Sequence, residues 1–219
     1  MNNSKNNEKL NLEHVFWVGG CPAGGKTTFA NYFSERYGFY TYHTDKQAYN
    51  IYQKTKSGDY PNFLKMAETD FDRLLFLPDD EWLEISILSM KEIFSMFISD
   101  LQKMPRDKYI IAEGAELLPV LLQDNCENDK VVFAIPSYEF FMKNLPEQKW
   151  VENIFNHLQG NDYKKQFIEN LLHKYNVFRE YLFESAEELN LKIVITNDRT
   201  SFDENIKILS NHFSLIGRL

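Results

Sequence analysis

A glycine-rich stretch near the beginning of the sequence constrains this chain more than any other feature. It reads Gly-Cys-Pro-Ala-Gly-Gly-Lys-Thr from Gly20 to Thr27 and fits the spacing G-x-x-x-x-G-K-[ST]. In this pattern the glycines let several backbone N–H groups converge on phosphate oxygens at the start of a helix. Average residue frequencies give a chance match in roughly one chain of this length in a hundred. The stretch therefore predicts a phosphate-binding loop.

The residues on both sides of the stretch support this interpretation over a plain glycine turn. Val15 to Val18 form a short apolar run before it, and Phe29, Ala30, Phe33 and Tyr37 recur at helical spacing after it until Gly38. The order strand, loop and helix is the structural context that the motif requires.

The motif also assigns roles to its residues. We expect the nucleotide phosphates to contact Gly20, Ala23, Gly24, Gly25, Lys26, Thr27 and Thr28. Lys26 would reach the β- and γ-phosphates, and the Thr27 hydroxyl would bind Mg²⁺. ATP and Mg²⁺ are therefore the expected cofactors, and the sequence leaves ATP and GTP open. Cys21 fits a small filler better than a redox switch.

The rest of the chain alternates between strand-like and helix-like segments. Strand character recurs at 39–43, 108–112, 130–135 and 191–196. A helical insert of about sixty residues covers 46–105, with Asp79 or Asp80 as an N-cap, and a long helix covers 161–190, with Asn161 or Asp162 as its cap. Ser201 and Glu204 form a capping box for a last helix. Five strands alternating with helices predict a parallel α/β sheet.

Two carboxylates follow predicted strands. Asp45 comes just after the second strand and would accept a proton from, or orient, an attacking hydroxyl group; a solvated turn is the alternative. Glu113 ends the run Tyr109-Ile110-Ile111-Ala112 and would support the magnesium ion, as a Walker-B-type residue does. Gly114 would allow close packing there.

Phosphoryl transfer needs cations, and the chain has six arginines. Arg73 in the insert would bind an anionic acceptor or pair on the surface. Arg179 on the long helix would face the site or solvent, with solvent favoured. Arg199 after the last strand would contact the base or ribose, or lie in an ordinary loop. The segment 137–160 has no arginine and offers Lys143 and Lys149. The tyrosines that could line an acceptor pocket, with core packing the alternative for most, are Tyr40, Tyr42, Tyr49, Tyr52 and Tyr60.

Composition indicates one soluble domain. The chain has 219 residues and is 43 % hydrophobic, enough for one core over 13–219, with residues 1–12 expected to be a disordered tail. A net charge of −8 argues against a nucleic-acid partner. Two cysteines and five scattered histidines indicate neither disulfides nor zinc. The polar start and the absence of a long uncharged apolar run predict a cytoplasmic protein without a membrane partner, and the oligomeric state stays open.

The order of these features resembles the nucleotide-kinase-like branch of P-loop kinases. The motif from Gly20 to Thr27, Asp45, the insert and the strand Ile110-Ile111-Ala112-Glu113-Gly114 follow one another as in shikimate kinase, gluconate kinase, chloramphenicol phosphotransferase and the zeta-toxin kinases. The resemblance covers about 13–215. It implies a three-layer α/β/α fold with a five-stranded parallel sheet of order 2-3-1-4-5. It also implies an acceptor held by the insert, a mobile lid at 137–160, and Asp45 as the base for the acceptor hydroxyl.

These features predict an ATP-dependent phosphotransferase that acts on a small hydroxylated compound. A nucleoside or nucleoside monophosphate kinase is a close variant, in which Arg73 or another cation of the insert would bind the acceptor phosphate. A nucleotide-binding switch, or a kinase-like protein without efficient transfer, is the alternative from another class. It is suggested by the lysines that stand where the lid of this branch usually has arginines.

Overall fold

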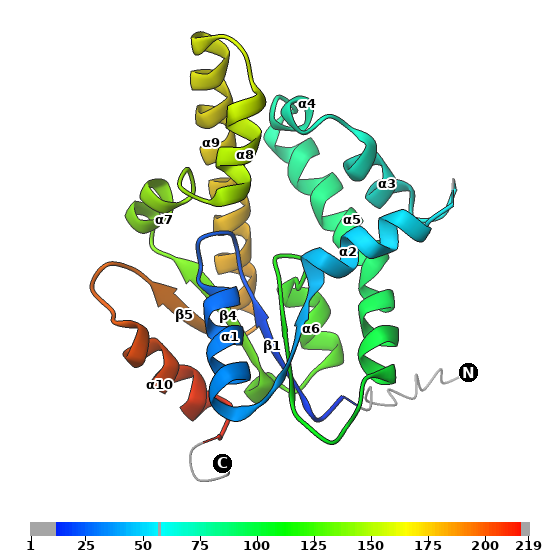
Figure 1. Cartoon of the computed structure of the whole chain (residues 1–219), viewed down its shortest axis with the longest axis vertical. Helices are drawn as coiled ribbons and strands as arrows, with labels where there is room; N and C mark the ends of the chain where they lie inside the picture. The colour runs from blue at the N-terminus through cyan, green and yellow to red at the C-terminus, as the bar shows by residue number, and fades with distance from the viewer. Residues whose placement is uncertain (1–11, 57, 216–219) are drawn as a thin grey trace.

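The structure, a computed structural model, describes residues 12–56 and 58–215 (Figure 1). The predicted tail lies outside the described residues except for Leu12, which is buried in the core. No helix in the described ranges is long and apolar enough to span a membrane. Cys21 and Cys126 are free thiols.

Five parallel strands form one sheet. They are β1 (Val15–Gly19), β2 (Tyr40–His43), β3 (Ile110–Glu113), β4 (Val131–Pro136) and β5 (Lys192–Thr196). Their order is β2-β3-β1-β4-β5, which confirms the predicted topology. The three inner strands are buried along their whole length, as is typical of a parallel sheet covered on both faces.

Helices cover both faces of this sheet (Figure 1). Phe16 packs with the inner faces of α1 (Lys26–Tyr37) and α10 (Phe202–His212). Trp17, the next residue of β1, points the other way. It packs with α5 (Asp79–Lys103), α6 (Pro119–Asn125) and α9 (Asn161–Glu188). Successive strand residues alternate between faces, so the result is the predicted three-layer α/β/α arrangement.

The helices beyond the carboxyl ends of the strands form the insert and the lid region. The insert consists of α2 (Thr44–Lys54), α3 (Pro61–Glu68), α4 (Phe71–Leu75) and α5. The 137–160 region folds into α7 (Tyr138–Asn144) and α8 (Lys149–His157), and a 3₁₀ turn, η1 (Asn128–Lys130), precedes β4. A separate apolar cluster joins α4, α7 and α8 to the first half of α9 (Figure 1).

Some of the predicted helix ends are confirmed, and others are wrong. The capping box of Ser201 and Glu204 is present, and Gly38 ends α1 with a φ of 71°. The predicted caps of α5 and α9 are wrong, because Pro78 and Gly160 occupy the N-cap positions. Asp79 instead begins α5 and accepts a hydrogen bond from the buried ammonium of Lys174 on α9.

Candidate active site

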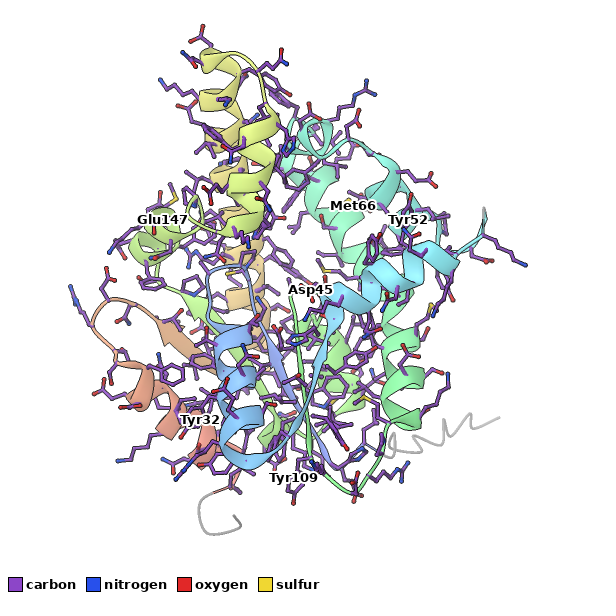
Figure 2. All side chains as sticks on the ribbon, in the orientation of Figure 1. Tyr32, Asp45, Tyr52, Met66, Tyr109 and Glu147 are labelled. Carbon is purple, nitrogen blue, oxygen red and sulfur yellow. The ribbon has the colours of Figure 1, made fainter. Side chains whose placement is uncertain are left out.

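A cavity of about 830 Å³ opens at the carboxyl edge of the sheet. The phosphate loop and the end of β3 form its floor, and the insert, α7, α8 and α9 form its walls. Figure 2 shows Asp45 at the start of α2, near the sheet, and Met66 on the helical insert. The lining side chains used below are those of Lys26, Thr27, Asp45, Trp82, Glu113, Glu116, Trp150, Tyr175 and Phe178.

The glycines of the loop allow it to lie directly against β4. A Cβ atom at Gly20 or Gly24 would come within 2.0 or 2.3 Å of the Ala134 carbonyl oxygen. These two glycines therefore serve packing, and they do not line the cavity. Gly25 has a φ of 83° and is the N-cap of α1, so the unpaired N–H groups of the first helical turn begin at the cavity. A helix N-terminus of this kind fits a phosphate group.

Lys26 and Cys21 lie in different surroundings within the loop, because Lys26 faces the cavity and Cys21 is buried in the core. The Lys26 ammonium donates a hydrogen bond to the Cys21 carbonyl oxygen at 2.9 Å, while the lysine also lines the cavity. Burial raises the pKa of the Cys21 thiol to about 12, against the opposing charges of Lys26 and Arg179. The thiol is therefore protonated at neutral pH, which agrees with its interpretation as a filler.

Glu113 joins three strands at the edge of the sheet. Its Oε1 atom accepts a hydrogen bond from the Thr27 hydroxyl at 3.1 Å and lies 2.6 Å from Nδ1 of His43. The strand register explains this contact, because Val18, Glu113 and His43 are aligned across β1, β3 and β2. No sequence motif marks His43, and its place at the end of a strand is the one feature that could have pointed to it.

This arrangement fits Mg²⁺ better than a metal held wholly by protein. No group of three or more His, Cys, Asp or Glu side chains in the described part of the chain could hold a metal ion. Mg²⁺ usually keeps several waters and binds one or two carboxylates together with substrate phosphates. The Thr27 hydroxyl and the Glu113 carboxylate, next to an open helix N-terminus, supply donors of that kind.

Asp45 lies where the sequence placed it, near the carboxyl end of β2. It is the second residue of α2, is exposed to the cavity, and accepts a hydrogen bond from the Lys46 backbone N–H at 2.7 Å. The buried Thr44 beside it lies 3.2 Å from the Glu113 carbonyl oxygen. A Cβ atom at Gly114 would lie 1.6 Å from the Thr44 hydroxyl, which bears out the close packing expected at Gly114.

Glu116 is a charged residue of the site that sequence reasoning missed. It follows β3, lines the cavity, and accepts a hydrogen bond from the Thr44 hydroxyl through Oε2. Burial raises the pKa of its carboxyl group. Burial, together with the charge of Glu116, also raises the pKa of Tyr175 on α9.

An aromatic cluster forms the cavity wall opposite the loop. The ring centroid of Tyr175 lies 5.7 Å from that of Trp82 and 5.7 Å from that of Trp150. None of the five tyrosines proposed for the pocket lines the cavity. Tyr42 is buried, Tyr40, Tyr52 and Tyr60 pack against the core, and Tyr49 is exposed, so the core alternative is right for most of them.

The three arginines considered for the site, Arg73, Arg179 and Arg199, all lie outside the cavity lining. The Arg73 side chain is 78 % exposed, pairs with Asp70 at 3.5 Å, and is not part of the cavity lining, which favours the surface alternative. Arg199 lies exposed in the loop after β5, also away from the lining. The preference for solvent at Arg179 is wrong, because only 14 % of its side chain is exposed and its guanidinium lies 5.9 Å from the ring of Tyr138.

No family model matches the sequence, and no curated protein matches it. Solved structures match over most of the chain. Shikimate kinase from Acinetobacter baumannii, in complex with shikimate, is 14 % identical, and the match covers 92 % of this chain and 93 % of that one, with a TM-score of 0.40. Deoxyadenosine kinase from M. mycoides, with products bound, is 12 % identical, and the match covers 92 % and 99 %, with a TM-score of 0.47.

The strand order and the loop after β1 define the fold. The fold is the three-layer α/β/α arrangement that the resemblance to P-loop kinases implies. The P-loop begins α1, the helical insert separates β2 from β3, and α7 and α8 follow β4.

Proposed function

We propose that this chain is an ATP-dependent phosphotransferase acting on a small hydroxylated acceptor. The observation that carries the proposal is that one cavity holds both halves of such a reaction. Lys26 and Thr27 of the P-loop line it together with Asp45 and Glu113. A loop that bound phosphate for structural reasons alone would not need a carboxylate at the cavity end of β2.

Each of these side chains has a distinct task. Lys26 leaves the Cys21 carbonyl for the β- and γ-phosphates of ATP, and the N–H groups at the start of α1 bind phosphate oxygens. Thr27 and Glu113 would hold Mg²⁺, and a bound Mg²⁺ would supply positive charge against the phosphates. Asp45 would orient the acceptor hydroxyl and accept its proton as the oxygen bonds to the γ-phosphorus, while the bond from that phosphorus to the β,γ-bridging oxygen breaks and ADP leaves.

Arg179 supports this proposal as a source of positive charge. The cavity residues contributed by α7 and α8, such as Asn144, Gln148 and Trp150, carry no charge. Arg179 of α9 is the arginine whose charge lowers the pKa of the Cys21 thiol in the loop, although its guanidinium lies outside the cavity lining and 3.7 Å from the Glu180 carboxylate. We infer that its guanidinium stabilises the transferring phosphoryl group when α7 and Tyr138 shift around bound ATP. We keep the proposal that Arg199 contacts the base or the ribose of the bound ATP.

A nucleotide-binding switch is the second candidate. One observation favours it, namely that Lys143 of the lid region pairs with Asp198 on the surface rather than lining the cavity. Such a protein would bind ATP without transferring its phosphoryl group.

The test is ATP consumption in the presence of nucleosides, sugars, amino alcohols and hydroxy acids, with Lys26→Ala as the comparison. The proposal expects at least one acceptor to raise turnover above basal hydrolysis in the parent protein only. If ATP stabilises the parent protein but no acceptor raises turnover, the switch is the better description.

A further inference from the structure

The charges of the cavity are unbalanced. Among its lining residues, all of which the structure describes, Lys26 is the one cationic side chain, whereas Asp45, Glu113 and Glu116 are acidic. In the proposed function Lys26 binds ATP, Glu113 supports Mg²⁺ and Asp45 meets the acceptor hydroxyl. Glu116 is then the charged group of the cavity without a task.

Glu116 is held in a defined position beside the acceptor half of the cavity. The Thr44 hydroxyl donates to its Oε2 atom, and Thr44, the first residue of α2, is itself fully buried. An ionised carboxylate accepts several hydrogen bonds, so one from Thr44 leaves capacity for a ligand. Glu116 lines the same cavity as Tyr175, Trp82 and Trp150 of the aromatic wall.

The aromatic wall is built from four separate helices. Phe71 of α4 lies 6.1 Å from Trp150 of α8 between ring centroids, and Tyr175 of α9 contacts both Trp150 and Trp82 of α5. Surfaces of this kind pack against planar rings and tolerate a positive charge on their faces. They offer no positively charged partner to a phosphate or a carboxylate.

We propose that the acceptor is a planar hydroxyl compound that carries no negative charge and donates an N–H group to Glu116. This inference rests on the proposed function and narrows its acceptor class. An anionic acceptor would bring its negative charge beside Glu116, and the cavity lining has no arginine to balance that charge. Such contacts between like charges weaken the binding of an anionic acceptor relative to a neutral or cationic one. A monophosphate acceptor would need a cation of the insert, but among the described residues of the insert no cation lines the cavity, and Arg73 lies on the surface.

The experiment compares matched ligand pairs by calorimetry while the P-loop is saturated with Mg²⁺ and a non-transferring ATP analogue. One pair is 4-aminobenzyl alcohol and 4-(hydroxymethyl)benzoate, and the other is adenosine and adenosine monophosphate. We expect the amine and the nucleoside to bind at least about tenfold more tightly than their anionic partners. Glu116→Gln should reduce each ratio to within about threefold, and Glu84→Gln, an exposed control on α5, should leave it unchanged.

Three results would overturn the inference: equal or tighter binding of the anionic members, ratios that survive Glu116→Gln, or no binding by any member of either pair. The same titrations separate this failure from failure of the proposed function. If the ATP analogue itself does not bind the parent protein, or binds Lys26→Ala equally well, the phosphotransferase proposal falls, and the acceptor class falls with it.

Discussion

Glu113 accepts a hydrogen bond from the hydroxyl of Thr27 over 3.1 Å, although the two residues lie 86 positions apart in the chain. The contact exists because β1 and β3 are neighbours in the sheet and α1 begins directly after the P-loop. Glu113 is only 4 % exposed, so its carboxylate is fixed before any ligand arrives. This pair is the basis of the proposed magnesium site.

Glu113→Gln should weaken the use of Mg²⁺ while keeping the hydrogen bond from Thr27, since an amide oxygen still accepts it. We expect the Mg²⁺ concentration for half-maximal turnover to rise about tenfold. The measurement is a magnesium titration of ATP turnover, with the melting temperature of the ligand-free protein as the control for folding. An unchanged magnesium requirement in a folded variant would remove Glu113 from the metal site.

Arg179→Met should lower kcat by about 100-fold and leave the affinity for ATP nearly unchanged, because the guanidinium is proposed to act on the transferring phosphoryl group. Arg73→Met is the matched control, and its exposed position predicts kcat and acceptor KM close to those of the parent. The check is steady-state kinetics of both variants. If Arg73→Met raises the acceptor KM strongly and Arg179→Met does not affect kcat, the roles given to the two arginines are reversed.

Gly114→Ala should destabilise the protein by about 3 kcal/mol, since the added methyl group would overlap the buried Thr44 hydroxyl. Gly38→Ala serves as the comparison. No atom lies within 4 Å of its added Cβ, and the cost of about 1 kcal/mol comes from its φ of 71° alone. Urea denaturation of the two variants measures the difference. Equal losses of unfolding free energy in the two variants would show that the structure around Thr44 rearranges to accommodate the added methyl group.

Stability should depend on pH through Glu116. Burial raises the pKa of this carboxyl group in the folded protein above its pKa in the unfolded chain. The contribution of Glu116 to stability is therefore fully present at a pH below the unfolded-state pKa, and it is lost as the pH rises through the folded-state pKa. Glu116→Gln removes this dependence. We therefore expect the melting temperature of the variant, relative to the parent protein, to be higher at pH 7 than at pH 4. A constant difference across that range would contradict the burial of a charged Glu116.

Much of the fold could be predicted because its signals are local. The apolar runs of β1, β3 and β4 are buried on both faces, and the P-loop requires a strand before it and a helix after it. The two carboxylates Asp45 and Glu113 were found for the same reason, since each follows a strand. The N-caps Pro78 and Gly160 were missed because capping propensity favours the acidic and amide side chains beside them.

The rest of the site depends on contacts between distant segments. His43 meets Glu113 through strand register, and Glu116 gains its position from Thr44. Tyr175 and Arg179 share the same long helix. The helical pattern of α9 gives its apolar face, but it does not show that the segment around Arg179 passes near the P-loop. Only the packing of α9 against the sheet determines which of its polar residues reach the site.

The central claim is that Asp45 and the P-loop form one phosphotransfer site, and Asp45→Asn tests it most directly. The variant keeps the size of the side chain but cannot take a proton from the acceptor hydroxyl. Transfer of the γ-phosphoryl group to the most active acceptor of the panel should fall by about 100-fold to 10,000-fold, while ATP affinity and melting temperature stay those of the parent. Asp59→Asn, away from the cavity lining, should transfer normally. Transfer by Asp45→Asn at the parent rate would contradict the account.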